Sequence, residues 1–126
     1  MSSSSICYTK SKVISYEQKL FIKKSLRQLG FNPKTKGFLF FEKAITFTYE
    51  YDIISINLYE IYRYIAYKTS QPFKTVESAF IYTFNNLNIK KLSLNYESIF
   101  DIEFSFEYFN ISSLLIDFID ILEYLQ

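Results

Sequence analysis

The sequence predicts a single, mainly α-helical domain, and three observations support this prediction. Its 126 residues are enough to build one hydrophobic core. Only two Gly and two Pro are present, which favours long regular elements over a turn-rich sandwich. Apolar residues recur at helical spacing in several segments. We therefore expect a compact helical bundle over residues 13–126, preceded by a flexible, Ser-rich tail over residues 1–12.

Helical periodicity is clearest in four segments, which are residues 15–29, 58–68, 73–86 and 111–125. The first has Ser15 as its N-cap and Gly30 just past its end, and Leu20 and Leu26 are among its apolar positions. Its outer face would carry a basic stripe of Lys19, Lys23, Lys24 and Arg27. The last follows a capping Asn110.

Two further segments alternate apolar and polar residues, which is the pattern of a strand. In residues 38–51, Ile45, Phe47 and Tyr49 alternate with polar residues, so the period favours a strand, although a helical stripe also fits. Residues 101–108 alternate almost without a break. We expect a short extended segment there, in the form of a strand, an arm or a wing.

The net charge of +1 conceals opposite charges at the two ends of the chain. Through residue 43 there are nine Lys or Arg and two acidic residues, whereas from Leu92 onward there are seven acidic residues and no basic one. This asymmetry suits an anionic partner at the basic end or head-to-tail pairing of protomers, and it is also compatible with ordinary solvated surface.

Catalysis by the common mechanisms is not expected from this composition. The chain has no His and one Cys, which leaves no Ser-His or Cys-His pair and no intrachain disulfide. We predict no enzymatic activity, no metal, no cofactor and no small-molecule substrate. The N-terminus lacks the apolar stretch of a secretory signal, and no run of about 20 apolar residues occurs, so we expect a cytoplasmic protein without a membrane span.

Residues 58–68 and 73–86, joined by a short break at Pro72, have the outline of a helix-turn-helix, with Pro72 in the first turn of the second helix. The stretch LGFNPKTKGFLFFEKAI, residues 29–45, adds a family resemblance. It is similar to the C-terminal effector domain of the stage-zero sporulation response regulator of endospore-forming bacteria. The similarity continues through Tyr62, Ile65 and Ala79 to the last helix.

The resemblance implies a helical bundle that binds promoter DNA, here as a free-standing effector domain without the receiver domain. It also implies that residues 40–53 are helical, against their period of two, and we expect a helix there on the strength of the resemblance. Arginines of the family's recognition helix correspond here to Thr75, Ser78 and Ile81, whereas Glu77 is retained. Lys68 remains as a candidate phosphate contact, so we expect altered DNA specificity.

Two functions follow as hypotheses. The first is a DNA-binding transcriptional regulator that contacts bases through Lys74, Thr75, Glu77 and Ser78. It would anchor on phosphates through Lys68, the basic first helix, and Lys34 and Lys36 of the loop. The second is a non-catalytic interaction module that kept the fold and lost specific DNA reading. In that module Ile81 and Tyr82 form a contact patch for a second copy or another regulator.

Overall fold

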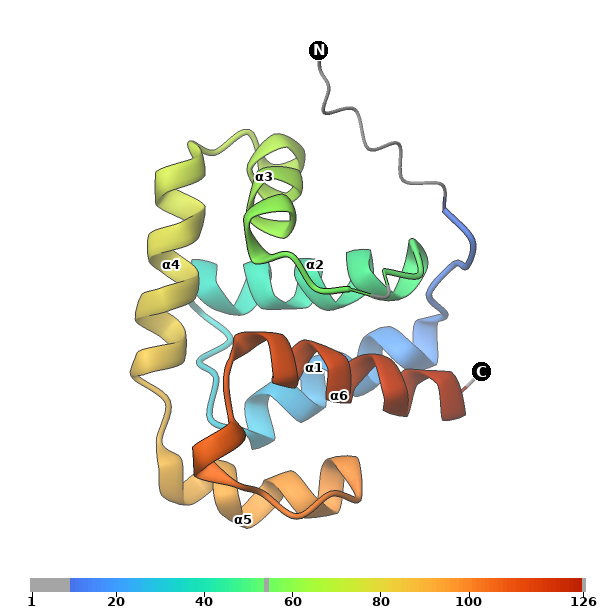
Figure 1. Cartoon of the computed structure of the whole chain (residues 1–126), viewed down its shortest axis with the longest axis vertical. Helices are drawn as coiled ribbons and strands as arrows, with labels where there is room; N and C mark the ends of the chain where they lie inside the picture. Colours follow the sequence, from blue (N-terminus) through green and yellow to red (C-terminus); the bar gives the residue numbers. More distant parts are fainter. Residues whose placement is uncertain (1–9, 54, 126) are drawn as a thin grey trace.

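The structure, a computed structural model of the chain, describes residues 10–53 and 55–125. Within these ranges the chain is a compact, mainly helical bundle without a β-strand, which confirms the predicted fold class (Figure 1). Its elements are α1 (Tyr16–Gln28), α2 (Lys36–Glu50), α3 (Leu58–Thr69), α4 (Phe73–Asn85), α5 (Ile89–Phe100), the short 3₁₀ helix η1 (Phe106–Tyr108) and α6 (Ile111–Tyr124).

Most of the expected tail, residues 1–9, lies outside the described residues. Residues 10–12 are held against the end of α2, where the Ser11 N–H donates to the Glu50 carbonyl at 2.8 Å. Lys12 also forms an ion pair of 2.6 Å with Glu123 of α6. The described chain before α1 is therefore part of the packed domain.

Helix α2 runs through the centre of the bundle and contacts α1, α3, α4 and α6 (Figure 1). Phe40, Phe41, Phe47 and Tyr49, which lie on different sides of α2, are all almost completely buried. The strand suggested by the period of residues 38–51 is therefore wrong. Only a narrow side of α2, at Leu39, Glu42 and Thr46, reaches the surface. Apolar residues therefore dominate most of the helix, and its few polar residues set an accidental period of two.

The helix ends follow the local signals in the sequence. Ser15 accepts from the Gln18 N–H and forms a capping box with it, and Asn110 does the same with Ser113. Gly30 has a φ of 105°, a conformation that side chains with a Cβ rarely adopt, and it ends the first helical segment. Pro72 is the N-cap of α4, one position before its expected place in the first turn.

Helix α5 was not among the predicted helices. It begins after Asn88, whose side chain accepts from the Lys91 N–H at 3.0 Å. Its buried residues Leu92, Tyr96, Ile99 and Phe100 follow helical spacing, so the signal was present in the sequence.

The predicted extended segment at residues 101–108 is neither a strand nor a wing. Asp101 ends α5 in the left-handed conformation, with a φ of 58°, and the chain then bends into η1. Phe104 packs against Tyr96 and Phe109, with ring centroids 5.3 Å apart in both pairs. No described strand lies beside the segment to pair with it, so its alternating residues fold back along α5 and α6 instead.

None of the helices in the described part of the chain combines the length and the apolar character that crossing a membrane requires.

Candidate nucleic-acid interface

Helices α3 and α4 correspond to the two helices predicted on either side of Pro72, with Ser70, Gln71 and Pro72 between them. Ser70 takes the left-handed conformation, with φ 54° and ψ 39°, and the Gln71 N–H donates to the Ala66 carbonyl at 3.0 Å. This closes α3 in the manner of many helix C-termini. The turn is thus fixed by backbone hydrogen bonds rather than by long side chains.

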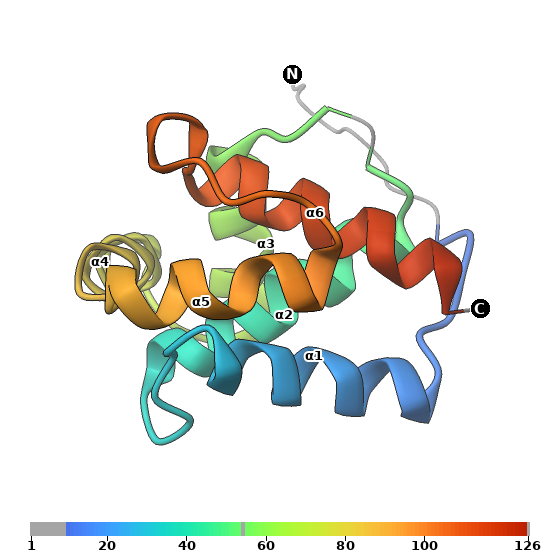
Figure 2. The ribbon, with the colours of Figure 1, turned by 90° about the horizontal axis from the view of Figure 1, so that it is seen from below.

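Core contacts set the rotation of α4 about its own axis. Val76 and Phe80 are fully buried, and the Phe80 ring lies 4.6 Å from Phe41 of α2 and 4.8 Å from Tyr62 of α3, measured between centroids. The opposite side of α4 forms one edge of the molecule, which no other element covers (Figures 1 and 2). We call this side the outer face of α4; its exposed residues are Lys74, Ser78, Ile81, Tyr82 and Asn85.

The four residues predicted to contact bases are all in the N-terminal half of α4. Lys74 and Ser78 are exposed, whereas Thr75 and Glu77 are half-buried. The Lys74 Nζ lies 3.6 Å from the Glu77 carboxylate, so the two charges partly compensate each other. Burial raises the pKa of Tyr62 in α3, and the negative charge of Glu77 adds to this shift.

Lys68 lies at the last turn of α3, next to the turn that leads into α4. Its Nζ is 5.8 Å from the centre of the Tyr64 ring, within the range of a cation–π contact. Burial and the neighbouring Tyr51 raise the pKa of Tyr64 to about 12, so this ring stays neutral at physiological pH. Lys74 therefore lies in the first turn of α4, whereas the Lys68 side chain lies against α2, in a hollow that Thr46, Glu50 and Tyr64 also line, and only its backbone adjoins the turn.

The loop between α1 and α2 reaches the other end of α4. A hollow of about 250 Å³ separates them, lined by Asn32 and Thr35 of the loop and by Tyr82 and Asn86 at the end of α4. Lys34 and Lys36, which adjoin Thr35, are exposed. The fold thus places Lys74 at the N-terminal end of α4, whereas Lys34 and Lys36 lie beside its C-terminal end.

Two lysines at this end of α4 were missed by the sequence analysis. Lys90 and Lys91 lie in the first turn of α5 and are exposed. A Cβ placed on Gly30 would lie 3.8 Å from the Lys91 side chain, so α5 begins beside the loop between α1 and α2. The Lys-Lys pair is visible in the sequence, but it could not be positioned while α5 was unrecognised.

The basic stripe of α1 extends away from α4. Lys23 is paired with Glu42 at 2.8 Å, whereas Lys19, Lys24 and Arg27 form no ion pair with any described residue. Figure 2 shows α1 running from the loop near α4 to the opposite end of the molecule. Lys19, in the N-terminal half of α1, is therefore remote from the outer face of α4.

The middle of the outer face of α4 is apolar. Ile81 is 45% exposed and Tyr82 is 71% exposed, and both were predicted as contact residues. No three acidic or Cys side chains among the described residues are grouped so that they could hold a metal ion. This face therefore presents amide, hydroxyl and apolar groups to a partner, with Lys74 at one end and Lys34 and Lys36 near the other.

No family model matches the sequence, and no curated protein or solved structure shows a significant similarity to it.

Proposed function

We propose that this protein is a DNA-binding transcriptional regulator that places the outer face of α4 in the major groove. The observation that carries the proposal is the position of Lys74 at one end of α4, with Lys68 nearby in the last turn of α3, and of Lys34 and Lys36 beside the other end. Helix α4 has 13 residues and is therefore about 20 Å long. That length exceeds the width of the major groove, about 12 Å, so the two lysine pairs suit phosphates on its opposite walls.

In this arrangement the base edges face the N-terminal half of α4. Thr75 and Ser78 each offer a hydroxyl group, and Glu77 can accept a hydrogen bond from a cytosine amino group once Lys74 turns to a phosphate. No arginine lies on this helix. We therefore expect phosphate contacts to supply most of the affinity and base contacts to supply modest discrimination.

The resemblance to the sporulation regulator's effector domain supports the same role. A transcriptional regulator of this kind acts where the DNA is, so we propose a cytoplasmic location.

The proposal is tested with a labelled duplex of random sequence, titrated at several salt concentrations between about 50 and 200 mM. Lys68→Glu combined with Lys74→Glu should weaken binding to all sequences and lower the log-log salt slope by about 1.8, which is about 0.9 for each phosphate contact. Lys34→Glu with Lys36→Glu should act in the same direction. The control is Lys19→Glu, which should leave the slope unchanged because Lys19 lies in the half of α1 that is remote from α4.

Glu77→Ala separates base reading from phosphate binding. It should change the preferred base at one position of a selected site while leaving non-specific affinity equal or slightly higher. Absence of duplex binding at about 50 mM salt, where electrostatic attachment is strongest, would overturn the proposal.

A second candidate function, a non-catalytic interaction module, is favoured by the exposure of Ile81 and Tyr82 and by the ion pair between Lys74 and Glu77. Such a module would bind another regulator through the apolar centre of the outer face of α4. Tyr82→Asp should abolish that interaction, whereas Asn85→Asp, one turn further along the helix, should not. If the first candidate is right, Tyr82→Asp weakens DNA binding instead.

A further inference from the structure

We propose that a groove between α5 and α6 binds the outer face of α1 from a second copy of this chain, so that copies associate head to tail. The outer face of α1 is the exposed side that carries Tyr16, Leu20, Lys24 and Arg27. This interaction is independent of DNA binding, because it uses neither α4 nor the lysines at its ends. The two surfaces are described in turn below.

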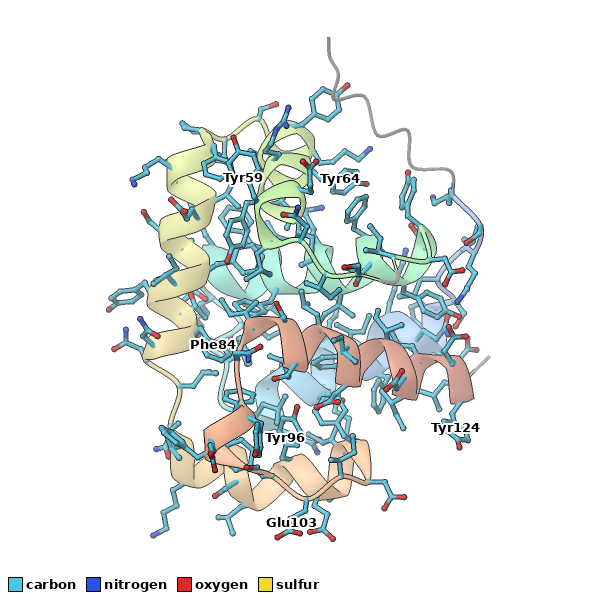
Figure 3. The ribbon with its side chains drawn as sticks, viewed as in Figure 1. Tyr59, Tyr64, Phe84, Tyr96, Glu103 and Tyr124 are labelled. Carbon is cyan, nitrogen blue, oxygen red and sulfur yellow. The ribbon has the colours of Figure 1, made fainter. Side chains whose placement is uncertain are left out.

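The groove lies where the end of α5 meets the second half of α6 and has a volume of about 540 Å³. We call it the α5–α6 groove. Its apolar lining comes from Phe100, Ile102 and Ile121, and its charged lining from Asp101, Asp117 and Asp120. Tyr124, 87% exposed, stands at the end of α6 and points away from the bundle (Figure 3). An apolar floor with an acidic rim suits a segment that is both apolar and basic.

The acidic rim is electrostatically uncompensated within the described structure. Asp101 and Asp120 are exposed and form no ion pair with any described residue. Asp117 is half-buried and accepts a hydrogen bond from the Tyr96 hydroxyl, which supplies no positive charge. Glu97, in the last turn of α5, and Glu103, just after the groove residue Ile102, are exposed and add further negative charge, and Glu103 points outward in Figure 3.

The outer face of α1 has the complementary character. Tyr16, Leu20, Lys24 and Arg27 are exposed and follow helical spacing along one stripe. Tyr16 is 72% exposed and Leu20 is 47% exposed, although Leu20 was expected to belong to the core. Lys24 and Arg27 have no ion-pair partner among the described residues. The stripe thus presents apolar groups in its first half and free cations in its second half, as helices that dock into grooves do.

A second copy is required because α1 cannot reach the groove of its own molecule. The inner face of α1 packs on α6: the Gln18 amide donates to the Leu122 carbonyl at 3.0 Å, and the Phe21 and Phe118 rings are 6.5 Å apart. The side of α1 that carries Tyr16 and Leu20 therefore faces away from α6, and Figure 2 shows α1 and α6 at opposite sides of the molecule with α5 between them. Each copy has one donor face and one acceptor groove, which is a heterologous interface that adds further copies unless a ring closes.

The experiment is sedimentation velocity of the full chain without DNA at about 100 μM, in about 50 mM and about 500 mM salt. We expect species larger than the monomer at low salt and a shift toward monomer at high salt, because screening weakens the charge contacts. Two variants should each be monomeric in low salt. One is Lys24→Glu with Arg27→Glu, and the other is Asp101→Asn with Asp120→Lys, in which Asn tolerates the left-handed φ of Asp101.

Mixing the two variants is the decisive step. The acidic α1 of the first variant fits the altered groove of the second, and the unaltered surfaces also match, so the equimolar mixture should associate again. Lys34→Glu with Lys36→Glu changes the net charge as much as the α1 variant does and should leave association intact. Leu20→Ser, which alters no charge, should raise the dissociation constant at least about tenfold.

A wild-type chain that remains monomeric at low salt, or a mixture that remains monomeric, would overturn the proposal. Equal loss of association in the Lys34/Lys36 control would do so as well, because the effect would then reflect net charge alone. Circular dichroism of each variant confirms that it is folded. Failure of duplex binding in these variants would bear on the proposed function and not on this interface.

Discussion

Gly37 at the start of α2 lies directly against the side chain of Thr83 in α4. A Cβ added to Gly37 would overlap the Thr83 hydroxyl oxygen and lie 2.7 Å from the Thr83 Cβ, which is closer than real Cβ contacts. Gly37 is in a helix and has no positive φ, so close packing and not backbone conformation requires glycine here. This contact sets the distance between the C-terminal end of α4 and the loop that carries Lys34.

Gly37→Ala should lower the free energy of unfolding by about 1 kcal/mol. The gain in helix propensity is about 1 kcal/mol, whereas forcing an extra methyl into a packed contact costs about 1–3 kcal/mol. Chemical denaturation measures the change. In a Thr83→Ala background the same substitution should cost at least about 0.5 kcal/mol less. In a Ser78→Ala background, on the exposed side of α4, its cost should be unchanged, and equal costs in both backgrounds would contradict the proposed contact.

Gln18 is a buried polar side chain that connects α1, α2 and α6. Its carbonyl oxygen accepts from the Ser15 N–H at 2.8 Å, and its amide nitrogen donates to the Tyr49 hydroxyl and the Leu122 carbonyl, both at 3.0 Å. Gln18→Met keeps the approximate volume but removes all three hydrogen bonds, so the free energy of unfolding should fall by about 3 kcal/mol. Gln28→Met, at an exposed site of the same helix, is the control and should change stability by less than about 0.5 kcal/mol.

The free energy of unfolding should fall as the pH rises through the range in which the Asp117 carboxyl loses its proton in the folded protein. Burial raises the pKa of this carboxyl; the hydrogen bond from Tyr96 opposes the shift and the charge of Asp120 adds to it. The folded state therefore holds its proton at a pH where the unfolded state, with an ordinary pKa of 3.8, has lost it. The stabilising effect of that proton is present at low pH and lost above the folded pKa.

Asp117→Asn isolates this contribution, since the amide oxygen still accepts from Tyr96 and carries no charge. Urea denaturation between about pH 4 and pH 7 should show a smaller decline in stability with rising pH for this variant than for the wild type. Asp117→Leu should be less stable than Asp117→Asn by about 1–3 kcal/mol, because the Tyr96 hydroxyl loses its acceptor. An identical pH profile for wild type and Asp117→Asn would contradict the assigned shift.

Ser70→Gly should stabilise the helix-turn-helix. Ser70 takes the left-handed conformation at the end of α3, which costs a residue with a Cβ about 1 kcal/mol. We expect a gain of about 0.5 kcal/mol, and a rise in melting temperature of roughly 2–4 °C, after the greater freedom of glycine in the unfolded chain is counted. Ser78→Gly, in the interior of α4, should instead destabilise by about 1 kcal/mol. Stabilisation by both, or by neither, would contradict this assignment.

The candidate interface was only partly predictable from the sequence. The placement of Lys68 and Lys74 on either side of the turn follows from two local helix patterns and Pro72. The approach of Lys34 and Lys36 to the far end of α4 depends on the contact between Gly37 and Thr83, which no local pattern encodes. Lys90 and Lys91 reach the same end only because α5 begins beside Gly30.

The sequence by itself determined the helical class and the positions of α1, α3, α4 and α6. Their signals are capping side chains and apolar stripes, and both depend on interactions between residues three or four positions apart. The period of residues 38–51 favours a strand and the resemblance implies a helix over residues 40–53; the structure has a helix over Lys36–Glu50, whose narrow outer side leaves only a weak helical stripe. Only the tertiary structure decided that Leu20 faces solvent and that α1 and α6 lie on opposite sides of the molecule with α5 between them, since these relationships depend on how distant segments share one core.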